Sequence, residues 1–225
     1  MMDNYWQTVI ERQFAAAIQM IRMAIQECPA DLWDDRTEGS PFWHLAYHVL
    51  FYIDLYLSEN DKKFQPRKYH TDKAHFLPGD YKEFGGIVNT PDKAFTKDQL
   101  LDYADHCLLK CQDTFAKLTN KRALERCGFW WYELNVGEFL INNLRHAQHH
   151  AGQLTMLLRR RASIGIDWLG TKDNQPRPPH GEGRVHVQYL NNACSITNIS
   201  LPAGDIYFIY VTFISCNDLL LHFGI

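Results

Sequence analysis

Four histidines form two pairs with i,i+4 spacing, in the segments SPFWHLAYHVLFY and NLRHAQHHAGQLTMLLRR. The first pair is His44 and His48, and the second is His146 and His150. On an α-helix such residues lie one turn apart on one face, so two imidazoles can converge on one ion while a second helix supplies a third. Three histidines leave a coordination position open, as a catalytic metal requires. The spacing therefore predicts a metal centre between two helices.

Polar residues run along the face of the second segment that should point inward. Asn143, His146, His150 and Gln153 share one helical stripe that apolar residues flank. Burying imidazoles and amides costs roughly a few kcal/mol apiece unless they are bonded. Coordination to a metal would satisfy the imidazoles, and Gln153 and Asn143 are candidates to orient ligands or substrate from behind them.

The first segment should supply the third ligand. His48 sits among apolar neighbours, whereas His44 lies one turn earlier, near the helix start. We therefore expect His48 to bind the ion and His44 to lie at the rim of the site. His149 shares a more polar face with Asn142 and Arg145, and we expect it to be solvated.

Other residue types near these histidines carry weaker signals. Trp43, Tyr47 and Tyr52 are candidates to line a pocket, although aromatic residues at helical spacing more often belong to a core. Glu138 and Asp54 could act as a general base, but nothing in their context marks them, and we expect both at the solvated surface.

The cysteines indicate neither a disulfide framework nor a metal site. Six cysteines occur without a CxxC motif, so we expect free thiols in a reducing compartment. Cys107 and Cys111 share a helix face and are predicted to be core thiols.

Hydrophobic periodicity predicts four amphipathic helices, over residues 4–27, 40–60, 96–118 and 136–162. The second helix is expected to begin with Ser40 as its N-cap and Pro41 at its first helical position. Between the second and third helices, frequent Pro and Gly exclude a long regular element, and a connection of this length suggests a crossover to the same end of a bundle. We therefore predict an all-α four-helix bundle with a long crossover between helices 2 and 3.

The composition changes after Gly170, which divides the chain into a bundle over residues 1–170 and a linker and tail over residues 171–225. Residues 174–183 are rich in Pro and Gly, and residues 185–225 contain no Lys or Arg. Strands are the local preference near residues 185–189 and 206–215, with a possible hairpin turn around residues 202–205. The sequence assigns this tail no function.

Composition and charge exclude several classes of function. A net charge of -3 without long basic runs argues against nucleic-acid binding. The longest apolar run, residues 206–215, is about half of the ~20 residues that a membrane-spanning helix requires. The first residues lack the pattern of a secretory signal. We expect a cytoplasmic protein that contacts neither nucleic acid nor membrane.

The segment LRHAQHHAGQLTMLLRR resembles the signature of the DinB/YfiT-like superfamily, in which a helix carries HxxxH followed by a small residue, Gly and Gln. WHLAYHVLFY resembles the earlier helix of that family with its single metal-binding histidine, and GIDWLG resembles a common ending of these domains. The resemblance covers about residues 4–170. It implies a triad of His48, His146 and His150, whereas Ala151 stands where many relatives have Arg.

The resemblance implies a four-helix bundle, often a homodimer, that holds one divalent ion (Zn, Ni or Fe) through three histidines and water. Some members transfer low-molecular-weight thiols or isomerise thiol-bound substrates. The leading hypothesis is thus a divalent-metal-dependent enzyme, a thiol transferase or a hydrolase, acting on a small-molecule substrate.

Two other functional hypotheses are compatible with the sequence. A non-catalytic bundle could use the same metal to sense or sequester a small molecule, or simply to stabilise the fold. Coordination of the metal by His44 in addition to the other three histidines would favour this interpretation. Haem held between His48 and a histidine of the last helix is a further alternative, which the absence of a CxxCH motif disfavours.

Overall fold

The computed structural model describes residues 5–37, 39–78, 90–172, 186–190 and 193–197. The chain forms two compact units, Met1–Asn174 and Gln175–Ile225. The long helices of the first unit are α1 (Tyr5–Glu27), α3 (Phe42–Tyr56), α4 (Lys97–Lys117) and α6 (Val136–Ala162). Two short helices, α2 (Ala30–Trp33) and α5 (Asn120–Leu124), lie in connections and were not expected from the sequence. The predicted all-α bundle is confirmed.

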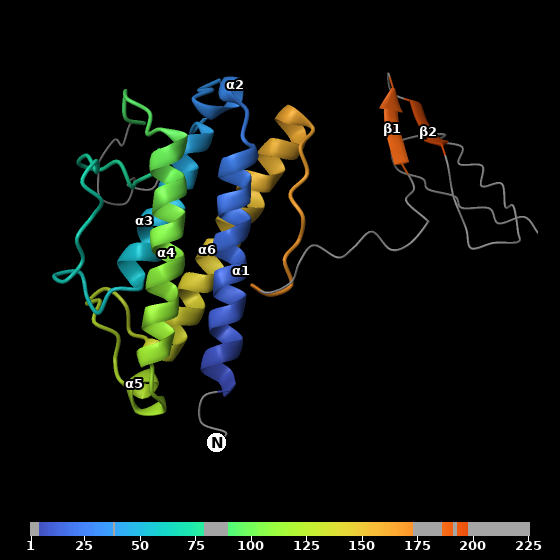
Figure 1. Cartoon of the computed structure of the whole chain (residues 1–225). Helices are drawn as coiled ribbons and strands as arrows, with labels where there is room; N and C mark the ends of the chain where they lie inside the picture. Colours follow the sequence, from blue (N-terminus) through green and yellow to red (C-terminus); the bar gives the residue numbers. More distant parts are fainter. Residues whose placement is uncertain (1–4, 38, 79–89, 173–185, 191–192, 198–225) are drawn as a thin grey trace, which may run out of the picture. The chain divides into compact units, whose positions relative to one another are not determined.

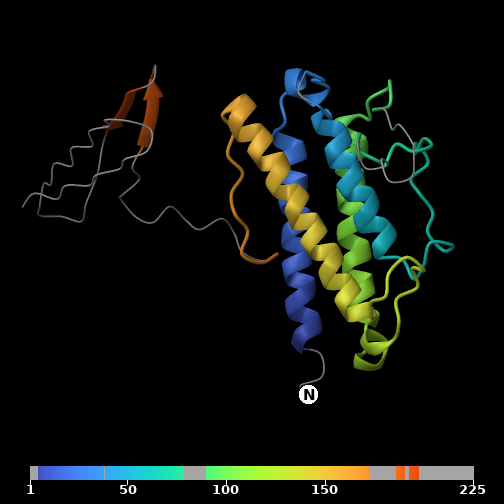
Figure 2. The same cartoon turned by 180° about the vertical axis from the view of Figure 1, so that it is seen from behind.

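The four long helices form a bundle in which α1 and α3 each pack against both α4 and α6. Helix α1 runs away from the end marked N in Figure 1, α3 and α4 both run back toward that end, and α6 runs parallel to α1. Figure 2 shows the same arrangement from behind. The crossover between α3 and α4 therefore returns the chain to one end of the bundle, and α3 lies antiparallel to α6.

Helix α3 is buried along almost its whole length, and Tyr52 is its half-buried exception. Helices α4 and α6 flank it, and the crossover covers part of its remaining surface. The ring of Phe51 packs edge-on against Phe64 of the crossover, at 5.1 Å between centroids, and Tyr47 contacts Tyr69 at 6.5 Å. This cover explains why α3 carries apolar residues on nearly every face.

The ends of α3 differ from the prediction. Pro41, not Ser40, is the N-cap, because its backbone is extended at φ -64° and ψ 158° and its carbonyl accepts from the following turn. The helix ends at Tyr56 rather than near Asn60, because the Ser58 amide donates to Leu55 O in a tighter turn.

Capping boxes fix the starts of α4 and α6. Thr96 and Gln99 bond each other's backbone at the start of α4, and Asn135 and Glu138 do the same at the start of α6. Ser163 ends α6 in the left-handed conformation, with φ 58°, and the amide of the next residue, Ile164, donates to Leu158 O at 3.2 Å. These local signals explain why α6 spans the predicted residues and α4 lies within one residue of its predicted bounds at either end.

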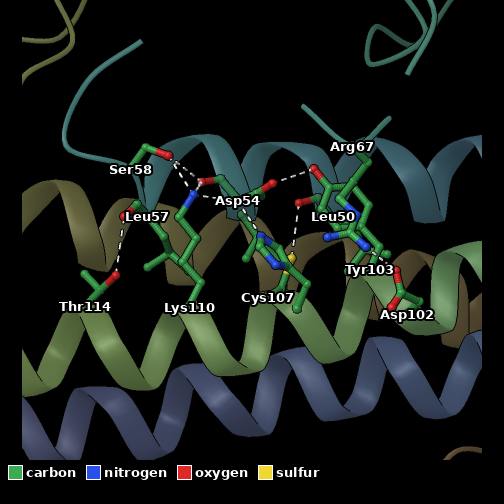
Figure 3. A network of polar contacts seen from close by, with 12 residues as sticks. Leu50, Asp54, Leu57, Ser58, Arg67, Asp102, Tyr103, Cys107, Lys110 and Thr114 are labelled. Atoms are coloured by element: carbon green, nitrogen blue, oxygen red, sulfur yellow. Dashed lines mark hydrogen bonds and ion pairs between the residues drawn. The ribbon is translucent and has the colours of Figure 1, made fainter. Parts of the chain in front are cut away.

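An ionic network around the buried carboxylate of Asp54 joins α3 to α4 (Figure 3). The side chain of Asp54 is only 1% exposed and accepts from Lys110 Nζ at 2.6 Å and from Tyr103 Oη at 3.0 Å. His106 Nε2 lies 3.2 Å from the same carboxylate, and Ser58 Oγ accepts from Lys110 at 2.6 Å. The expectation that Asp54 lies at the solvated surface is wrong, because α4 packs against the face of α3 that carries it.

The segment after α6 lies along α1. The amide of Lys172 donates to Arg12 O at 3.1 Å, and its Nζ lies 2.8 Å from both carboxylate oxygens of Glu11. The side chain of Gln13 donates to Gly170 O at 2.7 Å. These contacts anchor the end of the bundle unit.

The second unit contains an antiparallel pair of strands, β1 (His186–Leu190) and β2 (Ala193–Thr197), with His186 opposite Thr197. Strand β1 agrees with the strand preference predicted near residues 185–189. The hairpin turn and strand suggested for residues 202–205 and 206–215 lie outside the described residues.

Within the described ranges, no helix combines the length and the apolar character that crossing a membrane requires.

Candidate metal centre

Helices α3 and α6 bring three histidines together. One ring nitrogen from each of His48, His146 and His150 lies within 4.8 Å of the others. On α6, the Nε2 atoms of His146 and His150 are 3.0 Å apart. The imidazole centroids of His48 and His150 are 4.7 Å apart across the helix interface. The three residues that the sequence proposed as ligands therefore share one place and could hold a metal ion.

Oxygen acceptors fix the tautomers of two of these histidines. His48 Nδ1 lies 2.7 Å from the backbone carbonyl of His75, and His150 Nδ1 lies 2.6 Å from Gln153 Oε1. Because both oxygens can only accept, each Nδ1 carries a hydrogen, and in the neutral ring Nε2 then keeps its lone pair. Hydrogen bonds of this kind hold metal-binding imidazoles in orientation in many proteins.

Burial keeps the rings of His48 and His146 uncharged. Burial, reinforced by the neighbouring His150 and His146, lowers the pKa of His48 to about 2. Burial, with His150 beside it, likewise lowers the pKa of His146 to about 3. Both rings are thus neutral near neutral pH, the state in which imidazole binds a metal.

The arrangement on α6 fits a shared ion. Two nitrogens that each lie ~2.1 Å from one ion stand about 3.0 Å apart when they subtend roughly a right angle at it. In addition, His146 Nδ1 is buried without a hydrogen-bond partner in the described part of the chain. His146 Nε2 lies within hydrogen-bond distance of His150 Nε2, and a cation between the two rings would bind both nitrogens in place of that contact.

His44 lies elsewhere than at the rim of this site. It is fully buried, and its Nε2 donates to the backbone carbonyl of Ala74 at 3.0 Å. The adjacent carbonyl, that of His75, accepts from His48. Two consecutive carbonyls of the crossover thus accept hydrogen bonds from the two histidines of α3. His44 does not belong to the group of three converging rings.

Three other residues proposed for the site lie in the core. Asn143 is fully buried and donates to Ile53 O at 3.3 Å, which ties α6 to α3. Trp43 is fully buried and donates to Asp34 Oδ1 at 2.7 Å. The hydroxyl of Tyr47 lies 2.6 Å from His70 Nδ1 beneath the crossover. Glu138 is exposed, as expected, and caps α6.

A cavity of about 450 Å³ opens beside the histidines and is lined by His48 and His146. Three tyrosines form its aromatic wall: Tyr52, which was expected at the pocket, with Tyr56 and Tyr132.

The same cavity is lined by the face of α6 that the sequence suggested was merely solvated. Asn142, Arg145 and His149 all contribute to it, and His149 is exposed as expected. Their spacing around His146, at i−4, i−1 and i+3, was the available signal, because residues at these offsets border one another on a helix. Sequence reasoning missed that this polar face meets α3 at a cavity.

A larger cavity, of about 640 Å³, contains none of the three histidines. It is lined by residues of α4, of α5 and of the connection into α6, and Tyr56 is common to both cavities.

A family model described as the DinB superfamily matches residues 13–154, more than half of the chain. The matched range includes all three converging histidines. No curated protein and no solved structure matched the chain in the corresponding comparisons. With the helical bundle and the histidine arrangement in agreement with this match, the chain belongs to the DinB superfamily.

Proposed function

We propose that the protein is a divalent-metal-dependent enzyme that activates a low-molecular-weight thiol and transfers it to a small electrophilic substrate. The observation that carries the proposal is the convergence of three imidazoles, of which burial keeps those of His48 and His146 neutral, beside a cavity of about 450 Å³. Zinc, nickel and iron all suit imidazole ligands.

The surroundings of the histidines favour a catalytic centre over a bracing metal. A structural zinc is usually closed by four protein ligands. The candidate for the fourth ligand, His44, instead bonds its Nε2 to Ala74 O. The cavity reaches both His48 and His146, so a small molecule can approach the ion that these residues would hold.

The chemistry of the cavity favours a thiol over water as the nucleophile. A divalent ion held by neutral imidazoles keeps its full charge and would lower the pKa of a thiol or water in its open position. Metal-activated water starts from a pKa of about 15.7 and gains most from a general base. The part of the cavity wall that the structure describes contains no carboxylate to serve as that base. A thiol, whose ordinary pKa is about 8.5, needs less assistance.

The protein's own residues would hold and orient the reacting groups. His48, His146 and His150 would hold the ion, while the His75 carbonyl and Gln153 keep the rings of His48 and His150 in place. The thiol proton passes to solvent, the new carbon–sulfur bond forms, and the leaving group departs with its bonding electrons. Family membership supports the metal centre, while the homodimer and the cytoplasmic location remain predictions.

The experiment that tests this function combines metal content with a thiol-transfer assay. Untagged protein is analysed by elemental mass spectrometry and then assayed with cysteine and 1-chloro-2,4-dinitrobenzene by absorbance. We expect about one ion per chain and thiol consumption above the uncatalysed rate, with both lost in His146→Ala. His149→Ala serves as the control for metal content, because His149 is exposed and outside the converging group.

The outcomes separate the competing readings. A bound ion without transfer to this or related electrophiles would point to a non-catalytic metal-binding bundle. Absence of an ion after reconstitution with Zn²⁺, Ni²⁺ or Fe²⁺ would remove the metal centre altogether. A haem absorption band in the purified protein would contradict the hypothesis that three histidines hold a single metal ion.

A further inference from the structure

Arg145 is the one arginine or lysine among the residues that line the cavity beside the histidines, as far as the structure describes its wall. It directly precedes His146, and its side chain is exposed. Within the described part of the chain it forms no ion pair or hydrogen bond, whereas Arg22, Arg36 and Arg122 all pair with carboxylates. A guanidinium at this position is available to a ligand.

The charge of the cavity also selects for an anion. The described wall carries no Asp or Glu, so no carboxylate of the protein faces Arg145 across the cavity. An ion bound by uncharged imidazoles would add its full positive charge to that of Arg145. Two positive centres without a protein counter-charge attract a ligand that carries two negative groups.

The third feature of the cavity is its aromatic wall, which adjoins the histidines. The ring centroids of Tyr52 and Tyr56 are 5.3 Å apart, and those of Tyr56 and Tyr132 are 5.9 Å apart. The Tyr52 ring also lies 5.5 Å from His146. Aromatic rings that form a continuous surface pack well against a short hydrocarbon chain.

We propose that Arg145 anchors a carboxylate on the substrate thiol, so that the natural ligand is a small mercaptocarboxylate. The assignment of the ligand's thiol group rests on the proposed function, whereas the assignment of its carboxylate group rests on Arg145. The thiol faces the histidine centre, the carbon chain lies on the tyrosines, and the carboxylate accepts two parallel hydrogen bonds from the planar guanidinium. Arg145 is thus a specificity-determining residue.

The test compares two thiols that differ in a single group, 3-mercaptopropionate and 3-mercapto-1-propanol. Protein loaded with Co²⁺ is titrated with each, and binding is followed by the near-ultraviolet absorption that arises when a thiolate binds cobalt. The wild-type protein should bind the carboxylate about tenfold more tightly, as one charge-assisted pair provides. Arg145→Gln should abolish this preference, and Arg145→Lys should retain part of it.

The matched control is Arg160→Gln, an exposed arginine on the same helix. It lies fifteen residues from Arg145, or about 22 Å along the helix axis at 1.5 Å per residue. Its preference for the carboxylate should equal that of the wild type. Equal affinity for both thiols in the wild type, or an unchanged preference in Arg145→Gln, overturns the anchor while the metal centre stands.

A second measurement keeps the anchor testable if no Co²⁺ binds and the proposed function fails. Metal-free protein is mixed with 3-phenylpropionate, and broadening of its proton NMR signals is recorded. Broadening that is present in the wild type and lost in Arg145→Gln supports a carboxylate site in the absence of metal. Equal broadening in both proteins, or none in either, refutes it.

Discussion

Gln153 lies one helical turn after His150, and its Oε1 accepts the Nδ1 hydrogen of that ring at 2.6 Å. The bond points His150 Nε2 toward His146 Nε2, which is 3.0 Å away. Both partners belong to α6, so the helix itself sets their spacing. Gln153, a residue outside the three-histidine group, thereby controls which nitrogen His150 would present to a metal ion.

Loss of this acceptor should weaken metal binding without removing a ligand. We expect Gln153→Leu to lower metal affinity about 10–100-fold, the range typical for groups that support a metal ligand. Gln153→Glu keeps an oxygen at the same position and should retain affinity close to that of the wild type. Competition titration against a chromogenic chelator measures all three proteins, and equal affinity in Gln153→Leu would contradict the role of the bond.

Removal of the metal should lower thermal stability. A ligand that binds only the folded state stabilises it by about 2.7 kcal/mol when its concentration is 100 times Kd. We therefore expect chelation to lower the Tm of the wild type and to leave that of His48→Ala unchanged. Scanning calorimetry with and without chelator checks this, and His149→Ala, outside the converging group, should respond like the wild type.

The network of Asp54 predicts a large stability difference between buried and exposed ion pairs. Lys110→Met removes the cation from a carboxylate that is 1% exposed, and we expect a loss of about 3–5 kcal/mol. Asp105→Asn removes the exposed partner of Arg22 and should cost less than about 1 kcal/mol. Urea unfolding measures both. If Lys110→Met also lowers the free energy of unfolding by less than about 1 kcal/mol, Tyr103 and His106 alone are enough to stabilise the buried carboxylate of Asp54.

The left-handed end of α6 predicts a stabilising substitution. Ser163 has φ 58°, a conformation that costs an ordinary residue about 1–2 kcal/mol and glycine much less. We expect Ser163→Gly to raise the free energy of unfolding by about 0.5–1 kcal/mol. Met156→Gly, in the exposed interior of the same helix, should lower it by about 1 kcal/mol. Urea unfolding measures both variants. Changes of opposite sign in the free energy of unfolding would confirm that the backbone conformation at each position decides whether glycine stabilises or destabilises the protein.

The buried thiol of Cys111 predicts a loss of stability in alkali. Burial, and then the nearby Glu11, raise the pKa of Cys111 from 9.0 to about 12. Above pH 9 the unfolded chain releases the thiol proton and the folded chain keeps it, so stability falls as the pH rises from 9 to 12. Each pH unit in this window costs up to about 1.4 kcal/mol.

Urea unfolding under reducing conditions at pH 8 and pH 10.5 tests this linkage. The wild type should lose about 2 kcal/mol more between these values than Cys111→Ala does, since the alanine variant lacks the titrating group. An identical pH dependence in the two proteins would show that the thiol does not contribute.

Features set within a single helix were predictable from the sequence. The i,i+4 spacing of His146 and His150, the position of Gln153 and the capping box that begins with Asn135 depend on helical geometry alone. The inward polar stripe of α6 and the long crossover likewise led to the correct bundle, because periodicity and connection length restrict how helices can pack.

Contacts between distant segments were decided only by the tertiary structure. The carbonyl of His75 that holds His48 carries no side-chain signal, since every residue has such a group. The burial of Asp54 depends on α4 packing against its face of α3. The place of Arg145 in the wall of the cavity depends on where α6 meets α3. Local pattern determines the face on which a residue lies, but which partner meets that face is fixed only when the helices pack.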